Sequence, residues 1–255
     1  MARFTFWRNL KQSSYWSGIV WPFSVLILLL AFFLDPMYGS SVEFDFQEFE
    51  LVLIVSIFTI GLVFSPIIGK ETEKDRSSKI NDLLWSMSGP KTQLIGRFIG
   101  VMLLVAASIL IYALGLYVVD MYSNWLREAL RVFGPRDIIL ALLLLFQATL
   151  WLLTFATNVS IFVKNKSHLS QALLVIPIYV MLCGNIGLQL SNNVMHSFQV
   201  EVSVLLIPVL SQLLEFDKII HVYDSNLWFV LYLFFQFLLW SGYFRYVLKI
   251  YSKYS

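Results

Sequence analysis

Long apolar runs recur along the whole chain, and their lengths give the first prediction. A helix needs about 20 apolar residues to cross ~30 Å of hydrocarbon. Six runs qualify, and they cover residues 19–34, 49–68, 98–119, 138–163, 169–190 and 227–244. A seventh run, 202–214, is shorter and carries Pro208, so we do not expect it to span. The pattern predicts an all-α polytopic membrane protein in which residues 1–255 form one transmembrane domain with six transmembrane helices.

A different pattern precedes the first run, over residues 1–17. Phe4, Trp7 and Leu10 recur at three-residue spacing, opposite the polar residues Arg8, Lys11 and Gln12. Such a sequence is typical of an amphipathic helix that lies in the plane of the membrane. We therefore predict an interfacial N-terminal helix whose basic residues face water and which contacts membrane lipids.

The composition supports a membrane protein and excludes several other classes. Of the 255 residues, 58% are hydrophobic and 13% are charged, whereas soluble domains carry roughly 45–50% and about 25%. Apolar runs leave no stretch from which a soluble domain could form. A self-contained cytosolic enzyme, a nucleic-acid-binding module and a disulfide scaffold are excluded, the last because Cys183 is the only cysteine.

The distribution of basic residues predicts the orientation of the six helices. With the N-terminus inside, 14 of the 18 Lys and Arg residues fall on the inner side and 4 on the outer side. Basic residues concentrate in cytoplasmic loops of membrane proteins. We therefore expect a multi-pass protein of the plasma membrane with both termini in the cytoplasm. Counting 202–214 as a span would weaken this asymmetry.

The cytoplasmic loop at residues 69–97 is the inner loop that is long enough to hold structure. After a mixed-charge cluster, a serine at position 77 or 78 can begin a short helix, and Gly89-Pro90 ends it. Its apolar stripe follows helical spacing and consists of Ile80, Leu83, Leu84 and Met87. A stripe of this kind must be buried in something. Lipid headgroups and a cytoplasmic protein partner both remain open.

The outer loop at residues 191–226 is the longest loop of the chain. Its middle is too apolar to be fully solvated and is interrupted by Pro208. We predict an extracellular re-entrant hairpin whose non-helical backbone is covered by protein, because bare backbone is not tolerated in hydrocarbon.

The sequence contains no recognisable catalytic or metal site. Its three histidines have no HExxH motif or cysteine partner. A phosphate-binding loop before Lys70 is ruled out because Phe64 stands in place of its first glycine and Glu71 in place of its Ser or Thr. We therefore predict no catalytic residue, no cofactor and no metal ligand in this chain.

Two groups of uncharged polar residues lie within the predicted spans. On the fourth span one helical face carries Gln147, Trp151, Thr154 and Asn158, and on the fifth the pair is Asn185 and Gln189. Pro177 should kink the fifth helix. The polar residues can form hydrogen bonds between helices, or they can line a pore or a subunit interface. Both interpretations remain open.

The central part of the chain resembles a known family. Residues 68–71, the stretch Leu83-Leu84-Trp-Ser-Met-Ser-Gly-Pro90, and Gly96-Arg97-Phe-Ile-Gly100 are similar to a conserved region of the permease subunits of ABC-2 type transporters. The six spans, the amphipathic entry helix and the outer hairpin also resemble that family. In the family this region forms the coupling helix that contacts the ATPase. Ser77-Ser78 and Arg97 differ from the residues usual there.

The resemblance implies a function and a set of partners. The chain would be half of a pore that works as a homodimer or a heterodimer with a related permease. Two separate ATPase subunits would bind ATP and magnesium and drive export of a lipid, a drug or a membrane-active peptide. The implied ATPase contacts are Glu71, Ile80, Asp82, Leu83, Leu84, Trp85 and Met87. A secondary transporter and a non-catalytic membrane assembly factor are the alternatives.

Overall fold

The structure is a computed structural model that describes residues 2–13, 15–17, 19–20, 46–77, 89–123, 134–163, 166–192, 203–221 and 226–254. In these ranges the chain is almost entirely helical and forms no strand. The helices are α1 (Ala2–Leu10), α3 (Phe46–Ser77), α5 (Pro90–Ser123), α7 (Pro135–Phe162), α8 (Lys166–Leu173), α9 (Val175–Asn192), α11 (Leu210–His221) and α12 (Asn226–Tyr254). The predicted first span at 19–34 lies almost entirely outside the described residues.

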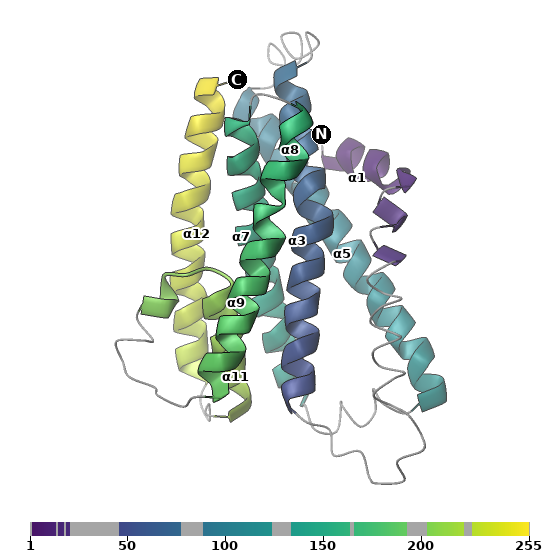
Figure 1. Ribbon diagram of the computed structural model, residues 1–255, viewed down its shortest axis with the longest axis vertical. Helices are drawn as coiled ribbons and strands as arrows, with labels where there is room; N and C mark the ends of the chain where they lie inside the picture. Colours follow the sequence, from purple (N-terminus) through teal and green to yellow (C-terminus); the bar gives the residue numbers. More distant parts are fainter. Residues whose placement is uncertain are drawn as a thin grey trace.

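The long helices run side by side along the longest axis of the molecule (Figure 1). Five helical stretches in the described residues are long and apolar enough to cross a membrane, one each in α3, α5, α7, α8 with α9, and α12. The chain is therefore an all-helical, multi-pass membrane protein. Both chain termini lie at one end of the bundle, which we call the termini end; the opposite end, near α11, is the hairpin end (Figure 1).

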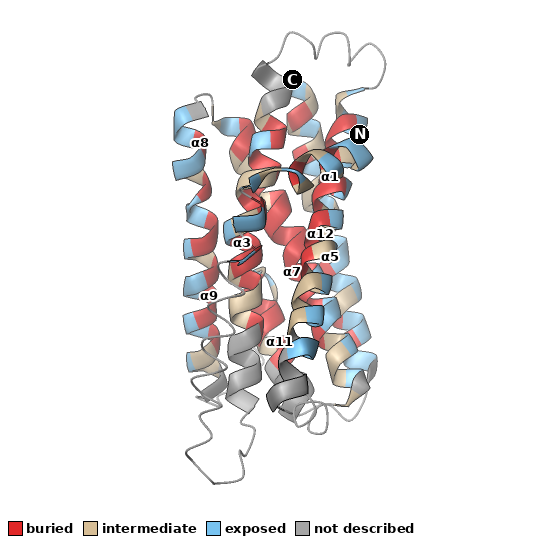
Figure 2. Cartoon of the chain, turned by 90° about the vertical axis from the view of Figure 1, so that its right-hand side faces the viewer, coloured by how far each residue is buried: buried red, intermediate tan, exposed pale blue. Residues whose placement is uncertain are grey.

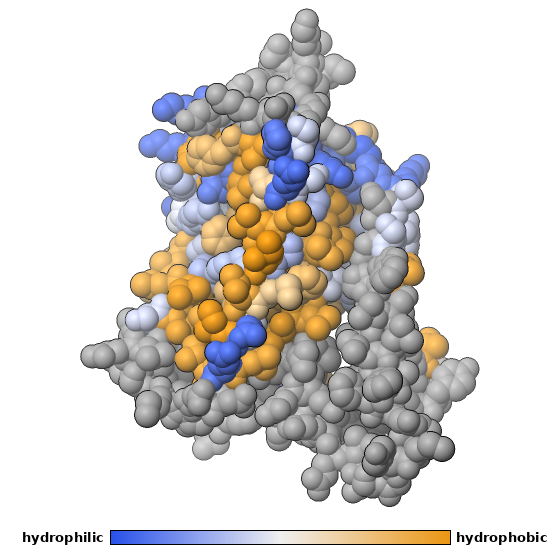
Figure 3. Space-filling model, viewed as in Figure 1, coloured by the Kyte–Doolittle hydropathy of each residue, from blue (hydrophilic) through white to orange (hydrophobic). Residues whose placement is uncertain are grey.

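Helix α7 forms the centre of the bundle. It packs against α3, α11 and α12, and 61% of its apolar stretch is buried, compared with 17% for α12. Its inward-facing residues, including Leu144, Leu152 and Leu153, are fully covered (Figure 2). The outer faces of the other helices carry large apolar side chains (Figure 3), which is the surface expected of a protein in contact with lipid.

Pro177 interrupts the helix predicted for the fifth span. Leu174 follows α8, and its N–H donates to the carbonyl of Gln171 at 3.2 Å. This bond reaches back three residues, instead of the four of an α-helix. Helix α9 then begins at Val175. Proline has no N–H to donate and its ring collides with the preceding turn. The predicted kink is therefore confirmed, and it separates α8 from α9.

The chain also breaks where Pro208 predicted a break. Residues 203–205 are helical, residues 206–209 are not, and α11 begins at Leu210. The exposed backbone of this break is bonded from within the protein: Tyr179 donates to the carbonyl of Pro208, and Gln236 Nε2 donates to that of Leu205 at 2.7 Å. Val209 is fully buried and its N–H is bonded by the side chain of Gln212.

Candidate functional site

A buried charged cluster joins α1, α3 and α5 at the termini end. Glu71 on α3 provides the carboxylate of this cluster, and its side chain is only 1% exposed. It accepts hydrogen bonds from Arg8, in a charged pair, and from Asn9 Nδ2 at 3.3 Å, both on α1. Arg97 on α5 places Nη1 3.6 Å from Oε2 of Glu71 and also donates to the Glu71 backbone carbonyl. One carboxylate thus holds three helices together.

The cluster fixes the orientation of α1. Its buried residues are the polar Thr5 and Asn9, whereas Phe4 and Trp7 are 61% and 50% exposed. Phe4 and Trp7 thus point away from the protein, as an interfacial helix requires, whereas Phe6 and Leu10 pack against the core. The expectation that the basic residues face water is wrong for Arg8, which is bound to Glu71. Burial lowers the pKa of the Arg8 guanidinium, which still stays charged at neutral pH.

A glycine on α5 allows α1 to approach closely. A Cβ atom at Gly100 would lie 2.8 Å from the backbone oxygen of Ala2 and 2.8 Å from Cβ of Thr5. Gly100 therefore allows close packing of α5 with the N-terminal helix. Farther along, the Tyr15 hydroxyl bonds to Ser108 at 3.0 Å and to the carbonyl of Leu104 at 3.2 Å. Burial raises the pKa of Tyr15.

The remaining implied ATPase contacts lie outside the described residues. Ile80, Asp82, Leu83, Leu84, Trp85 and Met87 all fall in segment 78–88. The ends of the segment are described, because α3 ends at Ser77 and α5 begins at Pro90. Both ends lie at the termini end (Figure 1). Glu71 and Arg97 therefore connect the two helices close to the base of this segment.

The polar line on α7 faces α12 and the interior. Gln147, Trp151 and Thr154 are buried and Asn158 is half-buried. Thr154 Oγ1 accepts from Trp240 Nε1 at 2.9 Å, and Asn158 Nδ2 donates to the Tyr243 hydroxyl at 2.6 Å. Trp151 stacks on Tyr243 with ring centroids 5.7 Å apart. Thr154 and Asn158 therefore form hydrogen bonds within the chain, whereas the buried donors Gln147 Nε2 and Trp151 Nε1 have no partner among the described residues; whether the line also borders a pore remains a prediction.

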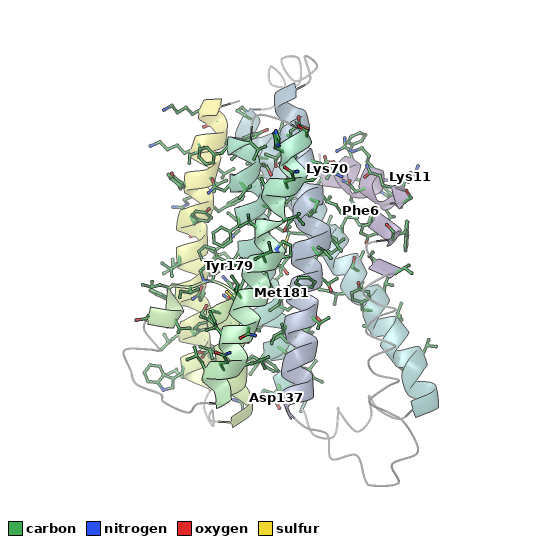
Figure 4. All side chains as sticks on the ribbon, viewed as in Figure 1. Phe6, Lys11, Lys70, Asp137, Tyr179 and Met181 are labelled. Atoms are coloured by element: carbon green, nitrogen blue, oxygen red, sulfur yellow. The ribbon has the colours of Figure 1, made fainter. Side chains whose placement is uncertain are left out.

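The second polar pair has the opposite environment. Asn185 and Gln189 are exposed on α9, and Gln189 Nε2 donates to Asn185 Oδ1 at 2.9 Å. Tyr179, one to two turns before Asn185, donates instead to the carbonyl of Pro208, while Met181 is 61% exposed (Figure 4). The structure therefore divides the predicted pore or interface residues into an inward group on α7 and an outward group on α9.

The described residues contain no group of three or more side chains that could hold a metal ion. Comparison of the chain with protein-family models, with curated proteins and with solved structures finds no match. The class of the protein, an all-helical multi-pass membrane protein, therefore follows from its fold, and a more specific function has to be argued from the site.

Sequence reasoning did not find the partners of Glu71. Arg8 and Asn9 precede it by 63 and 62 residues, and Arg97 follows it by 26. The signal that could have found them is positional: a carboxylate just after one apolar run and a guanidinium just before the next lie at the same membrane depth. Opposite charges at that depth are expected to pair.

Proposed function

We propose that the chain is the permease subunit of an ATP-binding-cassette transporter and exports an apolar or amphipathic substrate with ATP hydrolysed by a separate subunit. The observation that carries the proposal is the Glu71 cluster. It joins α3 to α5 about two turns from either end of segment 78–88, and it adds α1 through Arg8. A partner that pushes on the segment would thereby move three helices as one unit.

In the proposed orientation the protein lies in the plasma membrane with its termini end in the cytoplasm. Basic residues are concentrated at that end of the described helices. They include Arg3, Arg8, Lys11, Lys70, Lys91, Arg97, Lys166, Arg245, Lys249 and Lys253, with Arg136 and Lys218 at the hairpin end. This asymmetry supports a cytoplasmic termini end. Segment 78–88 is then accessible to a soluble ATPase.

The residues between α7 and α12 also favour an external ATPase as the source of energy. The polar residues described on the facing surfaces of α7 and α12 are amides, hydroxyls and aromatic rings, without carboxylates. Ion-coupled carriers generally place ionisable side chains at such positions. A secondary transporter is therefore a weaker candidate.

The proposal also includes the predicted first span at 19–34, which would be the sixth transmembrane helix, and the predicted re-entrant position of the outer hairpin.

In this proposal Glu71 acts from within the chain. Because its carboxylate is covered by α1 and α5, it would position the base of the segment, and the apolar stripe at Leu83 and Leu84 would bind the ATPase. Two large apolar side chains buried in a groove contribute roughly 3–6 kcal/mol before the costs of association. Loss of both should break the complex.

The test uses the tagged chain purified in mild detergent from the cells that naturally produce it. After irradiation with radiolabelled 8-azido-ATP, the wild type should carry a photolabelled ATPase of separate mass, and Leu83→Asp/Leu84→Asp should lose it. Asn81→Ser, which is not part of the predicted apolar stripe, is the matched control and should retain it. Equal labelling of wild type and double variant, with equal membrane insertion, would refute the proposed coupling.

A further inference from the structure

Four buried polar atoms on α7, α11 and α12 have no hydrogen-bond partner among the described residues. Three of them are donors and one is an acceptor: Gln147 Nε2, Trp151 Nε1 and Gln212 Nε2 donate, and Gln236 Oε1 accepts. The four side chains are between 0% and 6% exposed. Buried polar atoms of folded proteins are nearly always bonded to protein, to ordered water or to a ligand. The surplus of donors favours a bound group that offers oxygen acceptors.

Gln147 and Gln236 lie at the same height in the bundle. Both α7 and α12 run from the hairpin end to the termini end (Figure 1). Trp240 of α12 donates to the carbonyl of Leu150 on α7 at 3.1 Å, and this bond fixes their relative height. Gln236 precedes Trp240 by about one turn, and Gln147 precedes Leu150 by nearly one turn. Trp151 lies one turn after Gln147 on the same face of α7.

The first turn of α11 reaches the same height. Gln236 Nε2 donates to Ser211 Oγ at 3.2 Å, and Ser211 is the second residue of α11. The next residue is Gln212, whose Oε1 accepts from the Val209 N–H, so its amide is held at the start of the helix. Helix α11 also packs against α7. The unpartnered atoms therefore lie where the first turn of α11 meets α7 and α12. We call Gln147, Trp151, Gln212 and Gln236 the amide site.

The charges around the amide site favour an uncharged ligand. The N-terminus of a helix carries a partial positive charge, which disfavours a bound cation at the first turn of α11. Glu215 lies one turn after Ser211 and is 6% exposed, so its carboxylate disfavours a bound anion. Burial of an unpaired charge is also costly. A group with ester or amide carbonyls and a hydroxyl offers both acceptors and a donor without a net charge.

Aromatic rings from three helices lie next to the amide site. The ring of Phe155 on α7 has its centroid 6.1 Å from that of Tyr179 on α9 and 5.4 Å from that of Tyr243 on α12. Trp151 of the amide site stacks on Tyr243. Phe155, Tyr179 and Tyr243 are half-buried, so part of each ring is accessible at the molecular surface. We call these three rings the aromatic face, and an acyl chain lying on it would bring its head close to Trp151.

We propose that the amide site binds the uncharged head of a lipid that carries ester or amide carbonyls and a hydroxyl, as an acylglycerol does, with its acyl chain on the aromatic face. The carbonyl oxygens accept from Gln147, Trp151 and Gln212, and the hydroxyl donates to Gln236 Oε1. This inference rests on the proposed function for the transport of the lipid, and it deepens that function because it names the class of substrate and the residues that hold it.

Gln147→Leu tests the site through the stability of the purified chain in detergent. The substitution removes a buried donor that has no partner, so the ligand-free variant should melt at the same temperature as the wild type or higher. Added monoolein should raise the melting temperature of the wild type and leave that of Gln147→Leu unchanged. Ser65→Ala is the matched control, because Ser65 Oγ on α3 is also buried and unpartnered but is not part of the amide site. It should retain the shift with monoolein.

A monoacylglycerol with a diazirine in its acyl chain measures the binding directly. It should photolabel the wild type, and Gln147→Leu and Trp151→Phe should each reduce the labelling several-fold. Monoolein should compete, whereas oleyl sulfate and oleyltrimethylammonium, which have the same chain but charged heads, should compete poorly. Competition by either charged lipid as strong as that by monoolein would overturn the uncharged head. Equal labelling of the wild type and both variants would show that the amide site holds water alone.

The two proposals fail in different ways, because the photolabelling needs no ATPase. Labelling that depends on Gln147, in a chain that carries no ATPase, would overturn the proposed function alone. An associated ATPase together with labelling that does not depend on Gln147 would overturn the lipid site alone.

Discussion

Glu71 and Arg97 form a charged pair between α3 and α5, with Arg97 Nη1 3.6 Å from Glu71 Oε2 in a site where the carboxylate is 1% exposed. The pair is completed by Arg8 from α1. Charges in so covered a position are stable only when they are paired and hydrogen-bonded. The cluster is therefore a structural requirement for the junction of the three helices, whatever binds next to it.

Glu71→Gln should destabilise the protein strongly. The substitution keeps the shape of the side chain but leaves Arg8 and Arg97 without their carboxylate, and breaking a buried pair typically costs about 3–5 kcal/mol. The measurement is the apparent melting temperature of the purified protein in detergent. Glu73→Gln removes the same charge two residues later, at a half-buried position, where a loss of at most ~1 kcal/mol is expected. Equal melting temperatures for the two variants would contradict the assignment.

Gly100→Ala should displace α1 from α5. The new methyl group would meet the backbone oxygen of Ala2 at 2.8 Å, and backbone cannot move aside as a side chain can. Overpacking of this kind costs typically 1–3 kcal/mol. Thr5 is 1% exposed in the native chain. In a Cys183→Ser background, the thiol of Thr5→Cys should therefore react faster with maleimide when Gly100→Ala is also present. Gly242→Ala, with open space around it, should leave the labelling rate unchanged.

Hydropathy predicted the apolar part of each described span but not how far the helices continue. The second run was expected to end at 68, yet α3 continues to Ser77, because Glu71 and Thr72 are buried against other helices. The last run was expected to end at 244, yet α12 continues to Tyr254, because Val247 and Tyr251 pack with Leu94 and Ile161. Periodicity and hydropathy indicate which residues contact lipid, whereas these helix ends are stabilised by contact with protein.

The candidate site was less predictable than the fold. The sequence indicated Glu71 only through a family resemblance, and nothing in the sequence around Asn9 marks it as a partner of Glu71. Polar residues of α7 and α9 gave the same helical pattern in the sequence. Only packing separates them, since Gln147 is buried and Asn185 is exposed. Which side of a helix is covered depends on its neighbours in the fold, and a single sequence does not record those neighbours.

Trp240→Phe should weaken the contact between α12 and α7. The indole N–H donates to Thr154 Oγ1 at 2.9 Å and to the Leu150 carbonyl at 3.1 Å. Interhelical hydrogen bonds of membrane proteins contribute roughly 0.6–2 kcal/mol, so a small fall in melting temperature is expected. A double-mutant cycle with Thr154→Val should show coupling between the two sites. Trp228→Phe, at a position that is 63% exposed, should have no effect; additive losses in the cycle would argue against the bond.

Cysteine labelling should give opposite results at the two ends of the bundle. In intact cells carrying Cys183→Ser, a membrane-impermeant maleimide should modify Arg136→Cys at the hairpin end and leave Lys253→Cys at the termini end unmodified until the cells are permeabilised. Both native residues are exposed, so access to the side chain itself does not limit the reaction. The expectation follows from the excess of basic residues at the termini end. The reverse pattern would invert the proposed orientation.

Val209→Gly should be nearly neutral, although the side chain is completely buried. Its φ of 71° lies in the left-handed region, where a β-branched residue is strained by about 1–3 kcal/mol. Glycine removes that strain and loses the free energy of burying the side chain, about 1.5–3 kcal/mol, so the two effects nearly cancel.

Val180→Gly is the matched comparison, because Val180 is equally buried but lies within helix α9. There glycine loses the burial term and a further ~1 kcal/mol of helix propensity. The melting temperature of Val180→Gly should therefore fall well below that of Val209→Gly; similar values would mean that the hairpin backbone does not hold Val209 in the left-handed region.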